Sequence, residues 1–475
     1  MAQHTRIPDL ADTVQRVTRE GFFPSSPAAV VREATFSDIL AEVLATSPSE
    51  SDITRLYEEL QSHPSVDNED LATQLWDIFL DTYTTSGQRG ARGKEANRYL
   101  IPFHPAIAKH FKPQESRNWG RWYRMLMTSG RPPQFNNDLH EQFVDRLDSL
   151  NPSNLFEEVI VNAAENIETE EIGEIETQPI RPYIEACALR FQEDLRHWLD
   201  DTYESPSQWL QSTRDLICFH FMMYFVQLSV NLRLEFEAVQ EGEAENFDPT
   251  MRPIHFGLWD ERATQDRGFA NEWWERGPRG VEGDVYDSWG RLAVMHILTE
   301  TATESSFDIQ GAWTLSEAMD AYEPAAKAHA VEKMYSYLDT DLHPRDRRDL
   351  AAAAQLLVQA VRKHYESKSE SNQTPISMGI NVVRQLGSGQ DRRFFRSQQR
   401  IGKTFRLNRS SLRFFARLFH DPEEDSHIEE FWRYLRRRGI ALDSRSENEA
   451  LEELGKMGMI DRQSDSGGAV YVRSI

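Results

Sequence analysis

Residues 400–405, RIGKTF, contain the Gly-Lys-Thr triplet that ends a phosphate-binding loop. That loop also requires a glycine five residues before Gly402, where this chain has Ser397. It further requires a strand leading into the loop, and the arginines and glutamines before Gly402 do not predict one. The triplet therefore does not indicate nucleotide binding.

Glu366 and Lys368 form a Glu-x-Lys pair of the kind found in many nucleases. A nuclease core would place the pair on a strand, with an aspartate at the end of an earlier strand. Here the pair ends a predicted helix, and Asp346 and Asp349 lie at the start of that helix. The pair is thus interpreted as a solvated helix end, with a divergent metal-dependent nuclease kept as a weaker alternative.

Histidines and cysteines give no metal-binding pattern. His104 and His110 are six residues apart, which is a poor spacing for two ligands on one helical face. His220 lies in an apolar stretch and is interpreted as a hydrogen-bonded core residue. Cys187 and Cys218 stand far apart, which excludes a cysteine-rich zinc site and fits a reducing cytosol. The sequence predicts a protein that is not an enzyme, with no catalytic residue, metal or cofactor.

The overall charge and hydropathy indicate a cytoplasmic protein. The formal charge is −24, with 53 basic residues, nine of them lysine, against 77 acidic ones. This balance fits either a halophilic host or a GC-rich genome, and both stay open. The N-terminus has no apolar signal segment. The most apolar run, residues 216–232, is 17 residues long and includes polar side chains, so it predicts a buried helix rather than a membrane span.

Positive charge is concentrated in two segments. The first basic island, residues 86–135, has ten basic and two acidic residues; the second, residues 376–420, has ten and one. Six phenylalanines are interleaved with the arginines of the second island. Arginine pairs with phosphate and aromatic rings stack on bases, so the islands indicate DNA binding. Alternatively, the islands dock on acidic protein surfaces, and the aromatic residues of the first island form core: Phe103, Trp119, Trp122 and Tyr123.

The residues predicted to contact the DNA backbone, without sequence preference, are basic side chains of both islands and of a later helix. They are Arg89, Arg92, Lys94, Arg98, Arg121, Arg124, Arg392, Arg393, Arg396, Arg400, Lys403, Arg406, Arg409, Arg413, Arg417, Arg437 and Arg438. Charge reversal at Arg396, Arg400 and Arg406 is expected to weaken DNA binding without unfolding the protein.

Apolar residues at three- and four-residue spacing dominate the chain and predict a mainly α, multi-domain protein. Predicted helices cover residues 35–46, 68–85, 153–167, 181–203, 205–240, 284–304, 314–338 and 344–369. Alternating strand patterns are scarce before residue 440. Linker-like stretches predict boundaries near 175, 245 and 372. The expected parts are an N-terminal helical domain with the first island (1–175), a central aromatic helical segment (176–245), a helical domain (246–372) and a basic segment with a winged helix (376–475).

The last part of the chain predicts a winged helix-turn-helix module. Helical patterns at 408–420, 425–439 and 444–458 precede an alternating hairpin at 459–475. Its third helix, which often reads DNA, is acidic, with Glu447, Glu449, Glu452 and Glu453. Its basic residues lie on the second helix and the wing strands: Arg433, Arg436, Arg437, Arg438, Arg462 and Arg473. The module either grips DNA through these arginines or docks a protein; docking is favoured, with the second island as the DNA contact.

The end of the chain resembles the DptG family (also called DndG), accessory proteins of DNA phosphorothioation-dependent restriction systems. The resemblance lies in RRGIALD (437–443), LEELGKMGMI (451–460) and SDSGGAVYV (464–472). The aromatic stretch 216–236 is similar to the central aromatic helix of that family. The resemblance implies a role in antiviral defence, together with a DptF-like ATPase and a DptH-like helicase or nuclease subunit. It supplies no catalytic residue.

Two functions are therefore carried forward. In the first, the protein is a non-catalytic scaffold that joins DNA to the partner ATPase and nuclease subunits of a restriction complex. In the second, it is a stand-alone DNA-binding regulator that uses its winged helix directly.

Overall fold

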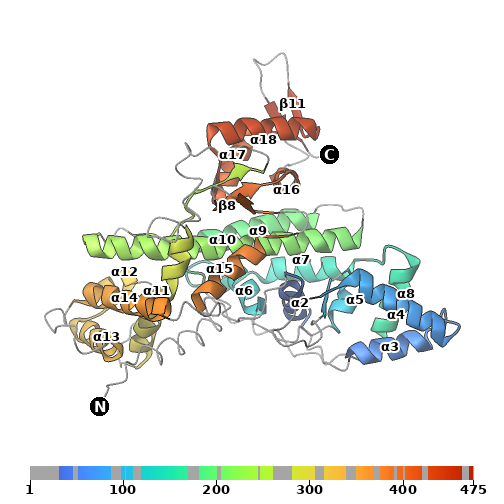
Figure 1. The fold of residues 1–475 in the computed structure, drawn as a ribbon, viewed down its shortest axis with the longest axis horizontal. Helices are drawn as coiled ribbons and strands as arrows, with labels where there is room; N and C mark the ends of the chain where they lie inside the picture. The colour runs from blue at the N-terminus through green and yellow to red at the C-terminus, as the bar shows by residue number, and fades with distance from the viewer. Residues whose placement is uncertain are drawn as a thin grey trace. The chain divides into compact units, whose positions relative to one another are not determined.

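The computed structural model describes residues 32–45, 52–86, 98–101, 103–110, 119–168, 181–200, 205–243, 247–259, 281–304, 315–338, 349–367, 375–389, 393–398, 402–419, 426–462 and 470–473. Over these residues the chain is mostly helical, which confirms the mainly α prediction (Figure 1). The described residues form two compact units: those within 183–186 and from 222 onward belong to unit 1, and those within 32–182 and 187–221 belong to unit 2. The expected boundaries near 175, 245 and 372 stay predictions.

Unit 2 is built from short helices. Its elements are α2 (Arg32–Val43), α3 (Asp52–Ser62), α4 (Glu69–Tyr83), β1 (Thr84–Ser86), β2 (Arg98–Leu100), α5 (Pro105–Ala108), α6 (Trp119–Leu126), β3 (Thr128–Ser129), β4 (Gln134–Phe135), α7 (Asn137–Asp148), α8 (Leu155–Glu165), and parts of α9 (Glu185–Asp200) and α10 (Pro206–Glu241). Asn68 and Asn154 cap α4 and α8, as their positions before an apolar run predict. The core between α3, α4, α5 and α8 includes Leu56, Phe79 and Ile160.

The helix α10 confirms the interpretation of the apolar run as a buried helix. Among the described helices it is the one long and apolar enough to cross a membrane, but its apolar window is entirely buried within the protein. Buried polar residues interrupt the apolar surface, and each has a partner. For example, the Nε2 of His220 lies 2.9 Å from the Oδ2 of Asp194 on α9, and both side chains are buried.

The helical part of unit 1 packs around α11 (Val281–Glu304), which contacts α13 (Pro324–Tyr337), α14 (Leu350–Ser367) and α15 (Pro375–Leu386) (Figure 1). The single helix expected over 314–338 is instead two, because Pro324 occupies the first turn of α13 and α12 (Leu315–Ala321) ends before it. Asp284 on α11 is buried and ion-paired at 2.8 Å with Arg233 on α10.

Unit 1 also contains short strands. A three-stranded sheet has the order β6 (Gly257–Leu258), β8 (Gly402–Leu407), β7 (Phe395–Gln398), with β7 and β8 antiparallel and β6 parallel to β8. The expectation that no strand leads into Gly402 is wrong, since β7 and β8 form a hairpin. The triplet at Gly402 lies on a strand rather than at the start of a helix, so it still lacks the form of a phosphate-binding loop.

The C-terminal module follows this sheet. It consists of α16 (Arg409–Phe419), β9 (Ser426–His427), α17 (Ile428–Arg437), β10 (Ile440–Ala441), α18 (Ser444–Lys456), β11 (Ile460–Arg462) and β12 (Val470–Val472), drawn in orange-red to red in Figure 1. The three predicted helices and the predicted hairpin are present. The strand β9 was not predicted; it pairs with β12 to give the sheet order β11-β12-β9.

A segment after α10, residues 250–259, joins this helix to the C-terminal part of unit 1. The Gln227 side chain accepts from the Arg252 N–H (2.8 Å) and donates to its carbonyl (2.7 Å). One turn along, Asn231 makes the same two bonds with Thr250 (3.1 and 2.9 Å). These hydrogen bonds from Gln227 and Asn231 to the backbone are called the clamp. After it, β5 (Ile254–His255) pairs with β10, and β6 pairs with β8.

Candidate nucleic-acid interface

The β7–β8 hairpin opens the described part of the second island, and its two faces differ. Because Phe395 is in register with Phe405, both rings lie on one face of the sheet. Their centroids are 4.9 Å apart, and Phe405 also packs 4.8 Å from Phe256. All three rings are buried, so this face belongs to the core. The prediction that the phenylalanines of the second island offer stacking surfaces for bases is therefore wrong for Phe395 and Phe405.

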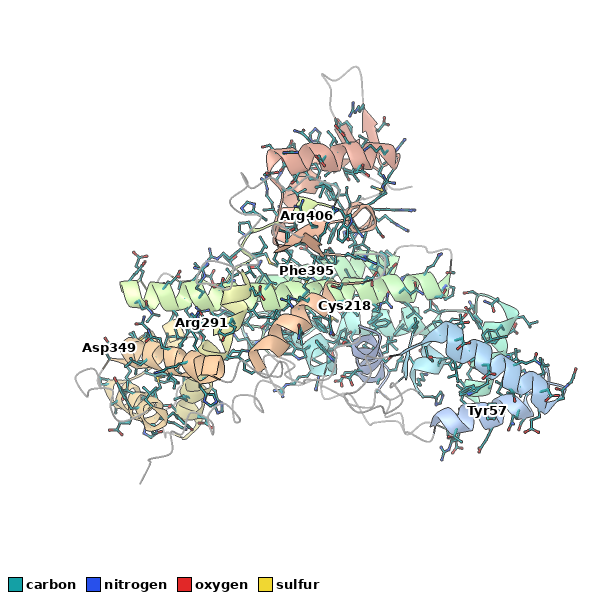
Figure 2. All side chains as sticks on the ribbon, viewed as in Figure 1. Tyr57, Cys218, Arg291, Asp349, Phe395 and Arg406 are labelled. Carbon is teal, nitrogen blue, oxygen red and sulfur yellow. The ribbon has the colours of Figure 1, made fainter. Side chains whose placement is uncertain are left out.

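The opposite face of the same sheet carries Arg396, Thr404 and Arg406. Arg406 is only 2% exposed, and Figure 2 labels it above Phe395. Its Nε donates to the Thr404 hydroxyl (3.0 Å) and its Nη1 to the Leu258 carbonyl (2.8 Å). Arg406 thus links β8 to β6, and the prediction that it contacts DNA is wrong.

The helix α16 presents the clearest basic surface. Asn408 caps it by accepting from the Ser411 N–H (2.8 Å). Its apolar face is buried through Leu412, Phe414, Phe415, Ala416 and Leu418. Arg409, Arg413 and Arg417 follow one another at four-residue spacing, so they lie along one side of the helix. Arg413 is exposed, Arg417 is half-buried, and the Arg409 side chain is 63% exposed. These three residues are called the arginine stripe.

One end of the arginine stripe meets the acidic third helix of the module. Glu453 on α18 accepts from Arg409 (2.8 and 3.0 Å) and from Lys456 (2.6 Å), and these hydrogen bonds lower the pKa of Glu453. Similarly, Glu447 on α18 accepts from Arg436 on α17 (2.9 Å). Acidic residues of α18 therefore hold arginines of both neighbouring helices. No acidic side chain among the described residues pairs with Arg413.

The other predicted DNA contacts in the second island and on α17 differ in the exposure of their side chains. Arg393 is exposed and donates to the Gly389 carbonyl (3.3 Å), and Arg437 is exposed at the end of α17. Arg438 is 3% exposed, with its guanidinium carbon 3.4 Å from the centre of the Tyr434 ring, so the prediction that it contacts DNA is wrong. Arg392 and Arg400 lie outside the described residues, and only the backbone of Lys403 is described.

The burial of the aromatic residues in the first island supports the alternative that they form core. Phe103, Trp119, Trp122 and Tyr123 are all buried. On α6, Arg121 is half-buried, and the Nε of Arg124 is 2.9 Å from the Oε1 of Glu42 on α2. The remaining predicted residues of this island are not placed: Arg89, Arg92 and Lys94 lie outside the described residues, and Arg98 is described only as backbone of β2.

The structure places one unpredicted residue, Trp259, beside Arg396 of the second island. Trp259 follows β6, and its backbone N–H donates to the Leu407 carbonyl (2.9 Å). The Arg396 guanidinium carbon lies 5.2 Å from the centre of the indole ring, and both side chains are half-buried. The alternation Phe256, Leu258 before Trp259 is a strand signal that could have indicated this position.

The alternative catalytic signals do not gather into a site over the described residues. Glu366 falls in the last turn of α14, and Lys368 lies outside the described residues. Within the part of the chain that the structure describes, no three histidine, cysteine or acidic side chains cluster as metal ligands would. Cys187 and Cys218 are both buried, and neither forms a disulfide.

No known protein-family model matches this chain, and no curated protein matches it.

Proposed function

We propose that this protein binds the phosphate backbone of DNA without reading its sequence, and that the arginine stripe of α16 is the main contact. The observation that carries the proposal is the four-residue spacing of Arg409, Arg413 and Arg417. Four residues advance about 6 Å along a helix, so three guanidinium groups line up for one backbone strand. Arginine matches phosphate with paired N–H donors. The buried opposite face of α16 fixes the direction of the stripe.

The C-terminal module is proposed to be a winged helix-turn-helix. Its helices α16, α17 and α18 and its strand order β11-β12-β9 support this assignment. In such modules the third helix often enters the major groove. Here that helix is α18, on which Glu453 is paired with Arg409 and Glu447 with Arg436, while Glu452 is exposed. A phosphate in front of α18 would meet Glu452 with like charge. These acids favour a protein-docking role for α18 and disfavour the alternative of a sequence-reading regulator.

We further propose that the chain is a non-catalytic scaffold of the DptG family, acting in phosphorothioation-dependent antiviral restriction in the cytoplasm. The resemblance of residues 437–443, 451–460 and 464–472 supports this step. In this role the arginine stripe would hold DNA while α18 docks a DptF-like ATPase or a DptH-like helicase or nuclease subunit.

The DNA contact is tested by reversing one charge of the stripe. Arg413→Glu should weaken binding to duplex DNA at least about tenfold, because a charge-assisted hydrogen bond contributes about 1.5 to 3 kcal/mol and about 1.4 kcal/mol is a factor of ten. Arg55→Glu, at an exposed position on α3, makes the same change in net charge and should have little effect. Equal binding by wild type and Arg413→Glu, measured by fluorescence anisotropy, would refute the assignment of the stripe.

The scaffold role is tested separately by co-purification with a DptF-like ATPase. Glu452→Arg lies on the exposed face of α18 and should abolish partner binding while leaving DNA affinity unchanged or slightly higher. Loss of DNA binding alone in this variant would favour the regulator instead.

A further inference from the structure

The pairing of Trp259 with Arg396 places a flat apolar ring beside a positive charge across one face of the β6-β8-β7 sheet, since Trp259 follows β6 and Arg396 lies on β7. The indole and guanidinium are 5.2 Å apart, within the range of a cation–π contact. Neither side chain is buried in the core. No acidic side chain among the described residues pairs with Arg396.

The strands of the sheet fix the positions of Trp259 and Arg396. The Trp259 N–H is bonded to the Leu407 carbonyl, and Arg396 is in register with Thr404 on β8. The reverse face of the sheet packs Phe405 against buried rings. An aromatic platform that is already fixed loses little conformational freedom when a ligand stacks on it.

The platform also adjoins the arginine stripe. Leu407, which receives the bond from Trp259, ends β8, and Arg409 begins α16 two residues later. A single nucleic-acid strand could therefore place phosphates on α16 and a base beside Trp259. Proteins that bind single strands combine these two features: a positive groove for the backbone and aromatic side chains for the bases.

We infer that Trp259 and Arg396 form a stacking site for an unpaired base, so that the protein binds single-stranded nucleic acid more tightly than duplex. This inference rests on the proposed backbone contact of α16 and adds the form of nucleic acid that the surface selects. In a duplex the base faces are covered by their neighbours, so only the phosphate contacts would remain.

The test compares three ligands of equal length: a mixed-sequence single-stranded DNA, its duplex, and an abasic strand that keeps the phosphates but has no bases. The wild type should bind the single strand at least about tenfold more tightly than the abasic strand, given the known contribution of base stacking. A single-stranded RNA of the same sequence determines whether the site distinguishes the two sugars.

Substitutions at Trp259 and Arg396 distinguish a loss of base stacking from a loss of folding. Trp259→Leu should lose about tenfold in affinity for the single strand and nothing for the duplex, while Trp259→Phe keeps most of the affinity because it keeps a ring. Arg396→Gln should fall between them, and it provides a second test if Trp259→Leu does not fold.

The outcomes distinguish the inference from the proposed function. If Trp259→Leu and Arg396→Gln bind the single strand as well as wild type does, while Arg413→Glu binds weakly, the stacking site is refuted and the backbone contact stands. Equal wild-type binding of the single strand and the abasic strand would also refute stacking. If the wild type binds none of these ligands, both proposals fail.

Discussion

Replacing Gln227 by leucine should release the segment that joins α10 to the C-terminal part of unit 1. Gln227 is fully buried and makes both backbone hydrogen bonds of Arg252. Leucine has a similar volume, so the main effect is to leave one N–H and one carbonyl without partners. Each unpaired group costs about 1 to 3 kcal/mol. The two groups together cost about 2 to 6 kcal/mol, and water that reaches the half-buried Arg252 relieves part of this cost, which leaves about 1 to 4 kcal/mol.

Hydrogen exchange measures this effect locally. A loss of 2 kcal/mol corresponds to about 30-fold faster exchange of the Arg252 amide, because about 1.4 kcal/mol is a factor of ten. Amides of β5 should exchange faster as well. Gln240→Leu makes the same chemical change at an exposed position of the same helix and serves as the control. An acceleration below threefold in Gln227→Leu, or an equal one in Gln240→Leu, would show that the clamp does not hold the segment.

Three further predictions concern unit 1. Gly439→Ala should destabilise the protein by at least about 1 kcal/mol in thermal unfolding, because Gly439 has a φ of +80° and an added Cβ would lie 2.7 Å from the Nε2 of Gln227. Burial raises the pKa of Asp284 to about 6, despite the opposing charge of Arg233. Its ionisation in the folded state therefore costs stability as pH rises from about 4 to 6, and the stability of wild type relative to Asp284→Asn should fall by about 2 kcal/mol over this range in urea titrations. A flat difference would contradict the raised pKa. Arg406→Glu should unfold the protein or prevent its soluble expression, because a buried carboxylate would then face the Leu258 carbonyl. The yield of soluble protein and its circular dichroism spectrum measure this effect.

Helices and their ends could be predicted because they depend on local sequence. Asn68 and Asn154 stand before apolar runs of helical period and cap the helices that follow. Gly439 stands where α17 must end and adopts the left-handed backbone conformation expected of such a glycine. Pro324 is also a local signal, because proline is common in the first turn of a helix. It starts α13 and so divides the helix expected over 314–338 into two.

The exposure of individual arginines could not be predicted, because it depends on strand pairing between distant segments. Arg396 and Arg406 have the same residue type and lie in the same basic stretch. Pairing of β8 with β6, about 150 residues earlier, buries Arg406, while Arg396 on the outer strand β7 stays half-buried and contacts Trp259 across the sheet. Nothing in the composition of the second island distinguishes these two arginines. Arg438 is buried as well, although Arg436 and Arg437 next to it in the sequence are exposed.

Duplex DNA binding across a salt series tests the proposed backbone contact most directly. For wild-type protein, we predict equal affinity for duplexes of unrelated sequence and a linear fall of log affinity with log salt, with a slope of about −0.9 for each phosphate contacted. Arg413→Glu should make this slope shallower by about one contact. Failure to bind duplex DNA even at low salt, or a slope that Arg413→Glu does not change, would contradict the assignment of the arginine stripe to phosphates.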